Sequence, residues 1–184
     1  MVLEQGGSGS CIVIDGVLVD LIATEPLPAK LSDLPDDDGA RLFLLSHRWA
    51  LETASALAIS VVAGSETVAE VKVPVATTPA LVACKFAAFL GRPERRAPKR
   101  QSDALDIYRL SQILISDVAL FANFADAPHD LAALLARITR RQLSDRASSF
   151  AGLVHAAASL TDERVDALDV EALGLTLSDL LRSM

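Results

Sequence analysis

The spacing of apolar residues changes near residue 77, and no other feature of the sequence constrains the fold as strongly. Before this point, β-branched residues form short runs or alternate with polar ones, as in CIVIDGVLVDLIA, AISVVAG and TVAEVKVPV. After it, apolar residues recur every three or four positions almost to the C-terminus. The first pattern is typical of strands and the second of helices. The sequence therefore predicts an α+β fold, in which an N-terminal mixed or antiparallel sheet with helices precedes a helical C-terminal half.

Turn and cap signals place the expected elements of the N-terminal half. Asp15-Gly16 predicts a two-residue hairpin turn, because this dipeptide tolerates positive φ angles. Gly64-Ser65 predicts the turn between a second pair of strands. Ser46 is expected to cap a helix over HRWALETASALA. The segment LPAKLSDLPDDDGARL, with its run of three aspartates, is expected to be a solvated loop with at most a short helical turn.

Similar signals divide the helical half. Thr78 is expected to cap a helix that has Pro79 in its first position and runs to about Leu90. The segment GRPERRAPKRQ contains two prolines and is expected to be a loop, after which Ser102 caps a helix over DALDIYRLSQILI. The remaining spacing predicts helices near 128–137, 144–159 and 161–172, and a short terminal helix over LSDLLRSM.

Length and composition limit the class of protein. A chain of 184 residues, 51% hydrophobic and 22% charged, has room for one globular domain. We expect residues 1–91 to form an α/β part and residues 92–184 a helical part of one compact unit. Cys11 and Cys84 are too few for a disulfide framework, and neither a secretory signal nor a membrane span is recognisable. The sequence thus predicts a soluble, cytoplasmic protein.

The charge is unevenly distributed. The net charge of −7 argues against a protein that coats nucleic acid nonspecifically. Five cations nevertheless fall within nine consecutive residues: Arg92, Arg95, Arg96, Lys99 and Arg100. They are either a solvated loop whose charges pair with nearby acids or a surface for a polyanion such as RNA.

Other charges stand in unusual surroundings. Asp20 and Lys85 are each the one charge in an apolar run, VLVDLIA and PALVACKFAAFL. An ionised carboxylate in a buried strand needs a partner or a cation, whereas at a sheet edge it faces water. Lys85 either extends to solvent or carries a function. Asp103 and Asp106 lie three residues apart and therefore share a helix face, either as an exposed stripe or as partners of a cation.

The order of these residues resembles the second half of nucleotidyltransferase-fold proteins of the AbiEii/AbiGii abortive-infection toxin type. The matching elements are the strand VKVPV, the Thr78-Pro79 helix start, Lys85 among apolar residues, the following Arg92, and the Asp-x-x-Asp helix. Upstream, IDGVLVDLIA resembles the strand that carries the family's third metal carboxylate. The resemblance covers roughly residues 11–116.

The resemblance implies transfer of a nucleotidyl group from a nucleoside triphosphate to RNA or protein, with magnesium. The catalytic residues that it implies are Asp20, Lys85, Asp103 and Asp106, with Asp20 as the metal ligand. Lys85 is then expected to contact phosphates, and either Asp103 or Asp106 is expected to orient the lysine. Arg92 is expected to contact phosphate as well. The residues expected to bind nucleotide or acceptor are Arg92 and the neighbouring cations Arg95, Arg96, Lys99 and Arg100.

One departure from the family bears on activity. The family's Gly-Ser helix start and Asp-x-Asp pair, which supply two metal carboxylates, are not found upstream of Asp20. We therefore expect weak magnesium binding and negligible turnover, with either a late start of the reading frame or a degenerate relative as the cause. The alternatives are a non-catalytic remnant that binds a partner, such as a cognate antitoxin or a second copy through an exposed sheet edge, and an unrelated α+β domain.

Overall fold

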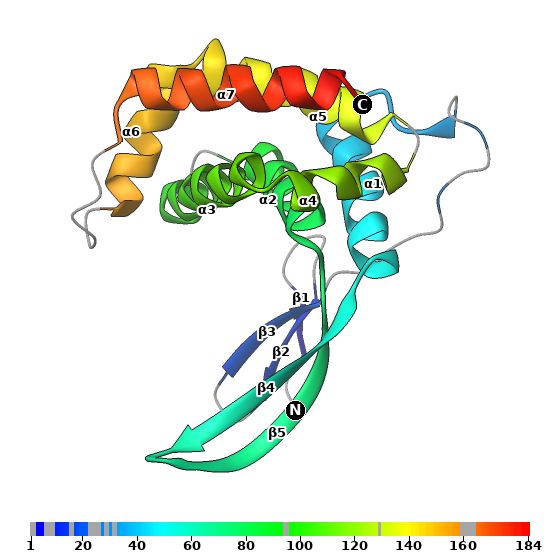
Figure 1. The fold of residues 1–184 in the computed structure, drawn as a ribbon, viewed down its shortest axis with the longest axis vertical. Coiled ribbons are helices and arrows are strands. Elements are labelled where there is room, and N and C mark those ends of the chain that lie inside the picture. The colour runs from blue at the N-terminus through cyan, green and yellow to red at the C-terminus, as the bar shows by residue number, and fades with distance from the viewer. Residues whose placement is uncertain are drawn as a thin grey trace.

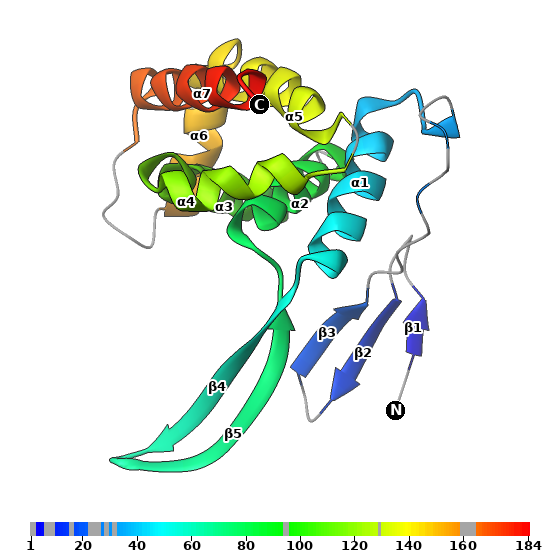
Figure 2. The same cartoon turned by 45° about the vertical axis from the view of Figure 1, so that its right-hand side comes forward.

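The structure is a computed structural model of the 184-residue chain. It describes residues 3–5, 10–14 and 17–21 by their backbone, and in full residues 27, 30, 33–93, 96–128, 130–158 and 165–184. Helices form a body of two layers, and two small sheets lie on one side of it (Figures 1 and 2). The α+β class with a largely helical C-terminal half is confirmed.

The first sheet is antiparallel with the order β1-β2-β3, formed by Leu3–Gln5, Ser10–Ile14 and Val17–Leu21. Ile14 pairs with Val17, which confirms the expected hairpin, although its turn residues lie outside the described residues. Asp20 lies in β3, opposite Cys11 of β2.

The second sheet is the long hairpin of β4 (Ser55–Ala63) and β5 (Glu66–Val75). Gly64 in its turn has φ 65°, a left-handed value that glycine adopts without the cost of a Cβ. The register shifts between Val61 and Val62, as in a β-bulge. The second pair of strands is therefore confirmed. The hairpin projects from the helical body in both views (Figures 1 and 2).

Helix α1 spans Asp38–Glu52 and corrects two expectations. The aspartate run is a loop only in part: Asp36 and Asp37 precede the helix, the Asp37 side chain caps it by accepting a hydrogen bond of 2.8 Å from the Ala40 N–H, and Asp38 is its first residue. Asp38 stands in the first turn and pairs with Arg137 at 3.0 Å. Ser46 is not a cap; it is buried in the middle of the helix.

Helices α2 (Thr78–Gly91) and α3 (Ala97–Ser116) flank the basic segment. The cap of α2 is Thr77, one residue before the expected one. The expected loop over GRPERRAPKRQ is too long: Arg92 and Pro93 lie outside the helices, but α3 begins at Ala97, with Pro98 in its first turn, where a missing N–H costs nothing. Ser102 is therefore inside α3.

The C-terminal helices also differ in part from expectation. The expected helices near 128–137 and 144–159 correspond to α5 (Leu131–Thr139) and α6 (Ala147–Ala158). The two expected last helices are one, α7 (Ala167–Arg182), which contains Gly174. A Cβ on Gly174 would lie 2.6 Å from Leu143 Cβ, so this glycine allows α7 to lie close to the helical turn that contains Leu143. The other elements are α4 (Val118–Ala122), the 3₁₀ turn η3 (Asn123–Asp126) and the π-helical turn η4 (Arg140–Ser144).

One apolar core joins the helices. α1 and α3 pack on α2, α3 packs on α6, and α5 and α6 pack on α7. The core includes Trp49, Phe86, Phe89 and Phe150, so it runs across residue 91 and joins both expected parts of the chain. Within the described part of the chain, no helix has the length and apolar character needed to cross a membrane.

Candidate functional site

Lys85 lies on α2 and is the single charge of that helix. Its neighbours Ala83 and Phe86 are fully buried, but the Lys85 side chain keeps 35% of its surface exposed. Its Nζ lies 2.7 Å from Asp106 Oδ2 and 3.6 Å from Asp103 Oδ1. The structure thus brings the lysine of α2 against both aspartates of α3.

Asp103 is the buried member of this group, with 2% of its surface exposed. The Arg92 Nε donates a hydrogen bond to its Oδ2, while Lys85 lies beside its other oxygen. A buried carboxylate is stable as an ion only when it is paired and hydrogen-bonded. Asp103 therefore fixes two cations, one from α2 and one from the segment that follows it.

These four residues, Lys85, Arg92, Asp103 and Asp106, are called the α2–α3 charge cluster below. The cluster carries two positive and two negative charges, and its cations and Asp106 remain partly exposed. An anion that displaces Asp106 from Lys85 would meet two cations whose positions are already fixed by Asp103. The geometry therefore suits phosphate or carboxylate binding more than proton transfer.

Asp20 is not joined to this cluster by the described geometry. Its backbone belongs to β3, and its side chain lies outside the described residues. In Figures 1 and 2 the β1–β3 sheet lies on the same side of the body as the hairpin, apart from α3. The resemblance implies that Asp20 and Lys85 face one cleft, and this stays a prediction. Among the residues described, no three His, Cys, Asp or Glu side chains are grouped as a metal site.

The remaining cations of the basic segment that the structure describes lie in different surroundings. Arg95 lies outside the described residues, and Arg96 and Lys99 are exposed at the start of α3. Arg100 instead lies over the Phe89 ring, with its Cζ 4.6 Å from the ring centroid. Their role toward nucleotide or acceptor is untested by the geometry.

Cys84 adjoins Lys85 but is not a candidate nucleophile. Burial raises the pKa of its thiol, and this outweighs the opposing effects of the Ser46 hydrogen bond and the Lys85 charge. A thiol with a raised pKa is largely protonated and unreactive at neutral pH.

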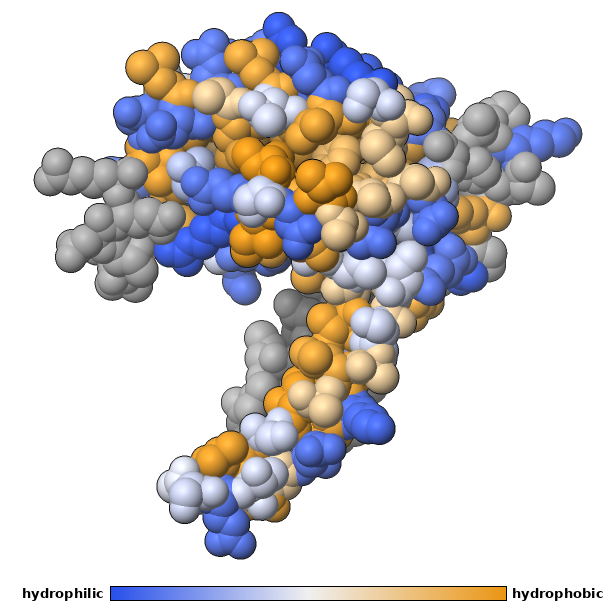
Figure 3. Space-filling view, viewed as in Figure 1, coloured by the Kyte–Doolittle hydropathy of each residue, from blue (hydrophilic) through white to orange (hydrophobic). Residues whose placement is uncertain are grey.

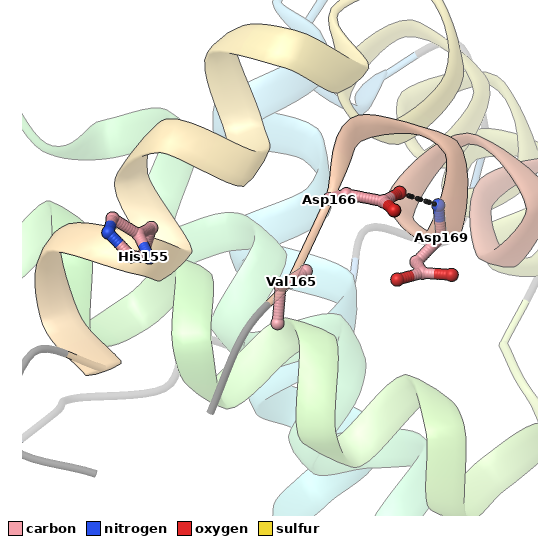
Figure 4. Close-up of a pocket in the computed structure, with 4 residues that line it drawn as sticks. All are labelled: His155, Val165, Asp166 and Asp169. Atoms are coloured by element: carbon pink, nitrogen blue, oxygen red, sulfur yellow. Dashed lines mark hydrogen bonds between the residues drawn. The ribbon is translucent and has the colours of Figure 1, made fainter. Parts of the chain in front are cut away.

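A pocket with a volume of about 500 Å³ lies between the last turn of α6 and the first turn of α7 (Figure 4). His155, Val165, Asp166 and Asp169 line it. The Asp166 carboxylate accepts a hydrogen bond of 2.9 Å from the Asp169 N–H, and so acts as the cap of α7. This accounts for one of the two carboxylates in structural terms.

Sequence reasoning did not single out Gln142, Arg146 and Ser149, which line a further pocket with Arg100. Their positions are 42 or more residues from Arg100, so local spacing held no signal that would join them.

No protein-family model, curated protein or solved structure matches this chain.

Proposed function

We propose that this chain is a nucleotidyltransferase-like, nucleotide-binding protein of the AbiEii toxin type. The observation that carries the proposal is the α2–α3 charge cluster, in which Lys85 contacts Asp106 at 2.7 Å and the buried Asp103 at 3.6 Å. The sequence resemblance implies a phosphate-binding lysine oriented by an Asp-x-x-Asp helix, and these contacts support that role.

The cluster has the physical properties that binding of a triphosphate requires. Asp103 is fixed by burial and by Arg92, whereas Asp106 is exposed enough to be displaced by an anion. The cationic groups of Lys85 and Arg92 are already positioned before the ligand binds, so the side chains need little reorganisation. Magnesium, held by Asp20, would neutralise the triphosphate and favour transfer of the nucleotidyl group to RNA or protein. With that single metal carboxylate we expect turnover to be negligible.

Binding of ATP, GTP, CTP and UTP with magnesium tests the proposal, measured by calorimetry on the full chain. The variant Lys85→Gln should weaken binding of the preferred nucleotide about tenfold or more, since a hydrogen bond to a charged group contributes roughly 1.5–3 kcal/mol. The matched control is Lys72→Gln, because Lys72 lies exposed on the projecting hairpin. Equal affinity of wild type and Lys85→Gln would overturn the role of Lys85.

Activity is tested separately by incubation with labelled nucleoside triphosphates and total RNA. We expect weak labelling at most, and Asp20→Asn should abolish what is found. Labelling that is robust and independent of Asp20 and Lys85 would contradict the proposed site.

A second candidate function is non-catalytic binding through the β4–β5 hairpin. Cross-strand partners share a face of a sheet, and one face carries the pairs Leu57–Val73 and Ile59–Val71. These side chains are exposed except for the partly buried Val73, and Figure 3 shows apolar side chains at the surface along the hairpin. The opposite face carries Ser60 and Glu70. A two-stranded ribbon with one polar face and one exposed apolar face typically packs its apolar face on another sheet.

A second copy of this chain is the occupant that we propose for that face, because two such ribbons have matching apolar faces. Light scattering after size exclusion over a concentration series should show a dimer. Ile59→Lys should shift the equilibrium to monomer, whereas Ser60→Lys on the opposite face should not. A wild-type chain that is monomeric at all concentrations excludes the second copy.

A further inference from the structure

We infer that the pocket enclosed by α2, α3, η4 and α6 binds a small organic phosphate. Its volume is about 330 Å³, at the lower end for small-molecule sites. Its polar lining consists of Arg100, Gln142, Arg146 and Ser149, and its apolar lining of Phe89, Phe150 and Leu153. It shares no residue with the α2–α3 charge cluster, so it does not depend on the proposed function.

The two arginines of the pocket lack the carboxylate partner that most described arginines have. Seven other arginines pair with carboxylates, as Arg140 does with Asp145 at 3.9 Å: Arg41, Arg48, Arg92, Arg137, Arg140, Arg141 and Arg182. Within the described parts of the chain, neither Arg100 nor Arg146 pairs with a carboxylate, and no acid lines the pocket. On a protein with a net charge of −7, two unpaired guanidinium groups around one pocket indicate an anion as the ligand.

The pocket is held in shape by its surroundings. The Phe89 and Phe150 rings contact each other with centroids 5.5 Å apart, and Arg100 lies over Phe89 at 4.6 Å. This cation–π contact restrains the guanidinium without neutralising its charge. An arginine that is ordered before binding loses less entropy when the ligand arrives.

The π-helical turn η4 supplies the opposite wall. It places Gln142, 5% exposed, in the lining, and Arg146 and Ser149 follow where α6 begins. Single π-helical turns are rare and frequently occur at functional sites. The amide and hydroxyl groups add neutral hydrogen-bond donors to the two cations, which together match the several oxygens of a phosphate.

The ligand class follows from these groups. Planar guanidinium groups bind phosphate through paired hydrogen bonds, and the apolar lining provides a surface for a small carbon body. A volume of about 330 Å³ admits a small phosphate monoester and excludes a folded polymer.

Calorimetry with phenyl phosphate, inorganic phosphate and phenol on the full chain tests the inference. Phenyl phosphate should bind more tightly than inorganic phosphate, and phenol should not bind. Arg146→Gln should weaken binding of phenyl phosphate about tenfold or more, the factor expected for one charge-assisted hydrogen bond. Arg146 is exposed, so this variant should keep the wild-type Tm.

The matched control is Arg140→Gln, which removes a partly exposed arginine of the same turn, η4, that does not line the pocket. It should leave the affinity unchanged, as should Lys85→Gln, which tests the other site. Absence of phenyl phosphate binding, or binding that Arg146→Gln leaves intact, would overturn the inference. Equal affinities for inorganic and phenyl phosphate would overturn the assignment of an organic ligand.

Discussion

The helical body and the β4–β5 hairpin are both built from regular apolar patterns, yet the body buries most of its large apolar residues whereas the hairpin leaves most of its own exposed. Trp49, Phe86 and Leu135 are buried to 1% exposure or less. Leu57 and Ile59 of the hairpin remain 53% and 44% exposed. A pattern therefore specifies which side chains share a face, whereas the packing partner decides whether that face leaves water.

The energetic consequence is large. Full burial of a large aliphatic or aromatic side chain contributes about 1.5–3 kcal/mol, and such residues occur in every layer of the body. A two-stranded hairpin alone is at best marginally stable in water. The body should therefore account for most of the free energy of unfolding, with the hairpin held by its covalent links to α1 and α2.

The largest effect that we expect comes from truncating one large apolar side chain in each of the two regions. Trp49→Ala should lower the free energy of unfolding by about 3–5 kcal/mol, because it leaves a cavity beside Phe124. Leu57→Ala should change it by less than about 0.5 kcal/mol, as for other exposed positions. Chemical denaturation of dilute monomer measures both values. A loss of 2 kcal/mol or more for Leu57→Ala would show that the hairpin face is covered in solution.

A smaller effect is expected from two of the helix glycines of the body, Gly174 and Gly152. Gly174→Ala should destabilise the chain by about 1–3 kcal/mol, because its Cβ would lie 2.6 Å from Leu143 Cβ and 2.7 Å from Ser144 Oγ. At Gly152 a Cβ meets nothing within 4 Å, so Gly152→Ala should stabilise the helix by about 0.5–1 kcal/mol. Opposite signs in thermal denaturation are the expected result. A Gly174→Ala variant as stable as the wild type, or more stable, would contradict the close approach of α7 to η4.

The sequence predicted elements well where a local signal decides them. The turn dipeptides and the alternation around them predicted both hairpins, because these signals lie within a few residues. The single helix α7 was missed, since the reason for Gly174 is its contact with Leu143 of another element. The early start of α3 was missed because Pro98 was interpreted as a helix breaker, whereas proline is tolerated in the first turn.

The candidate sites divide in the same way. The i, i+3 spacing of Asp103 and Asp106 predicted a shared face, and the helix pair brings Lys85 against it. Arg92 was singled out from the resemblance, but its contact with Asp103 depends on the segment between the helices. The pocket between Arg100 and Arg146 joins distant parts of the chain, so only tertiary structure reveals it.

The smallest effect concerns the pH dependence of the body, through His47 of α1. Burial lowers the pKa of His47, and this outweighs the opposing hydrogen bond with the Phe43 carbonyl. The unfolded chain therefore binds a proton more readily than the folded one. The stability that His47 contributes is complete above the unfolded pKa of about 6.5, and is lost as the pH falls toward the lowered folded pKa.

Urea denaturation at pH 7.5, 6.5 and 5.5 measures this contribution as a slope. The wild-type free energy of unfolding should fall over this range, and His47→Gln should reduce the fall, whatever its offset at pH 7.5. His155→Gln is the matched control, because it removes a histidine that is exposed on α6. Most carboxylates stay ionised over this range, so the difference between the variants reports the imidazole. Parallel slopes for wild type and His47→Gln would show that the ring of His47 is as accessible to water as the hairpin side chains are.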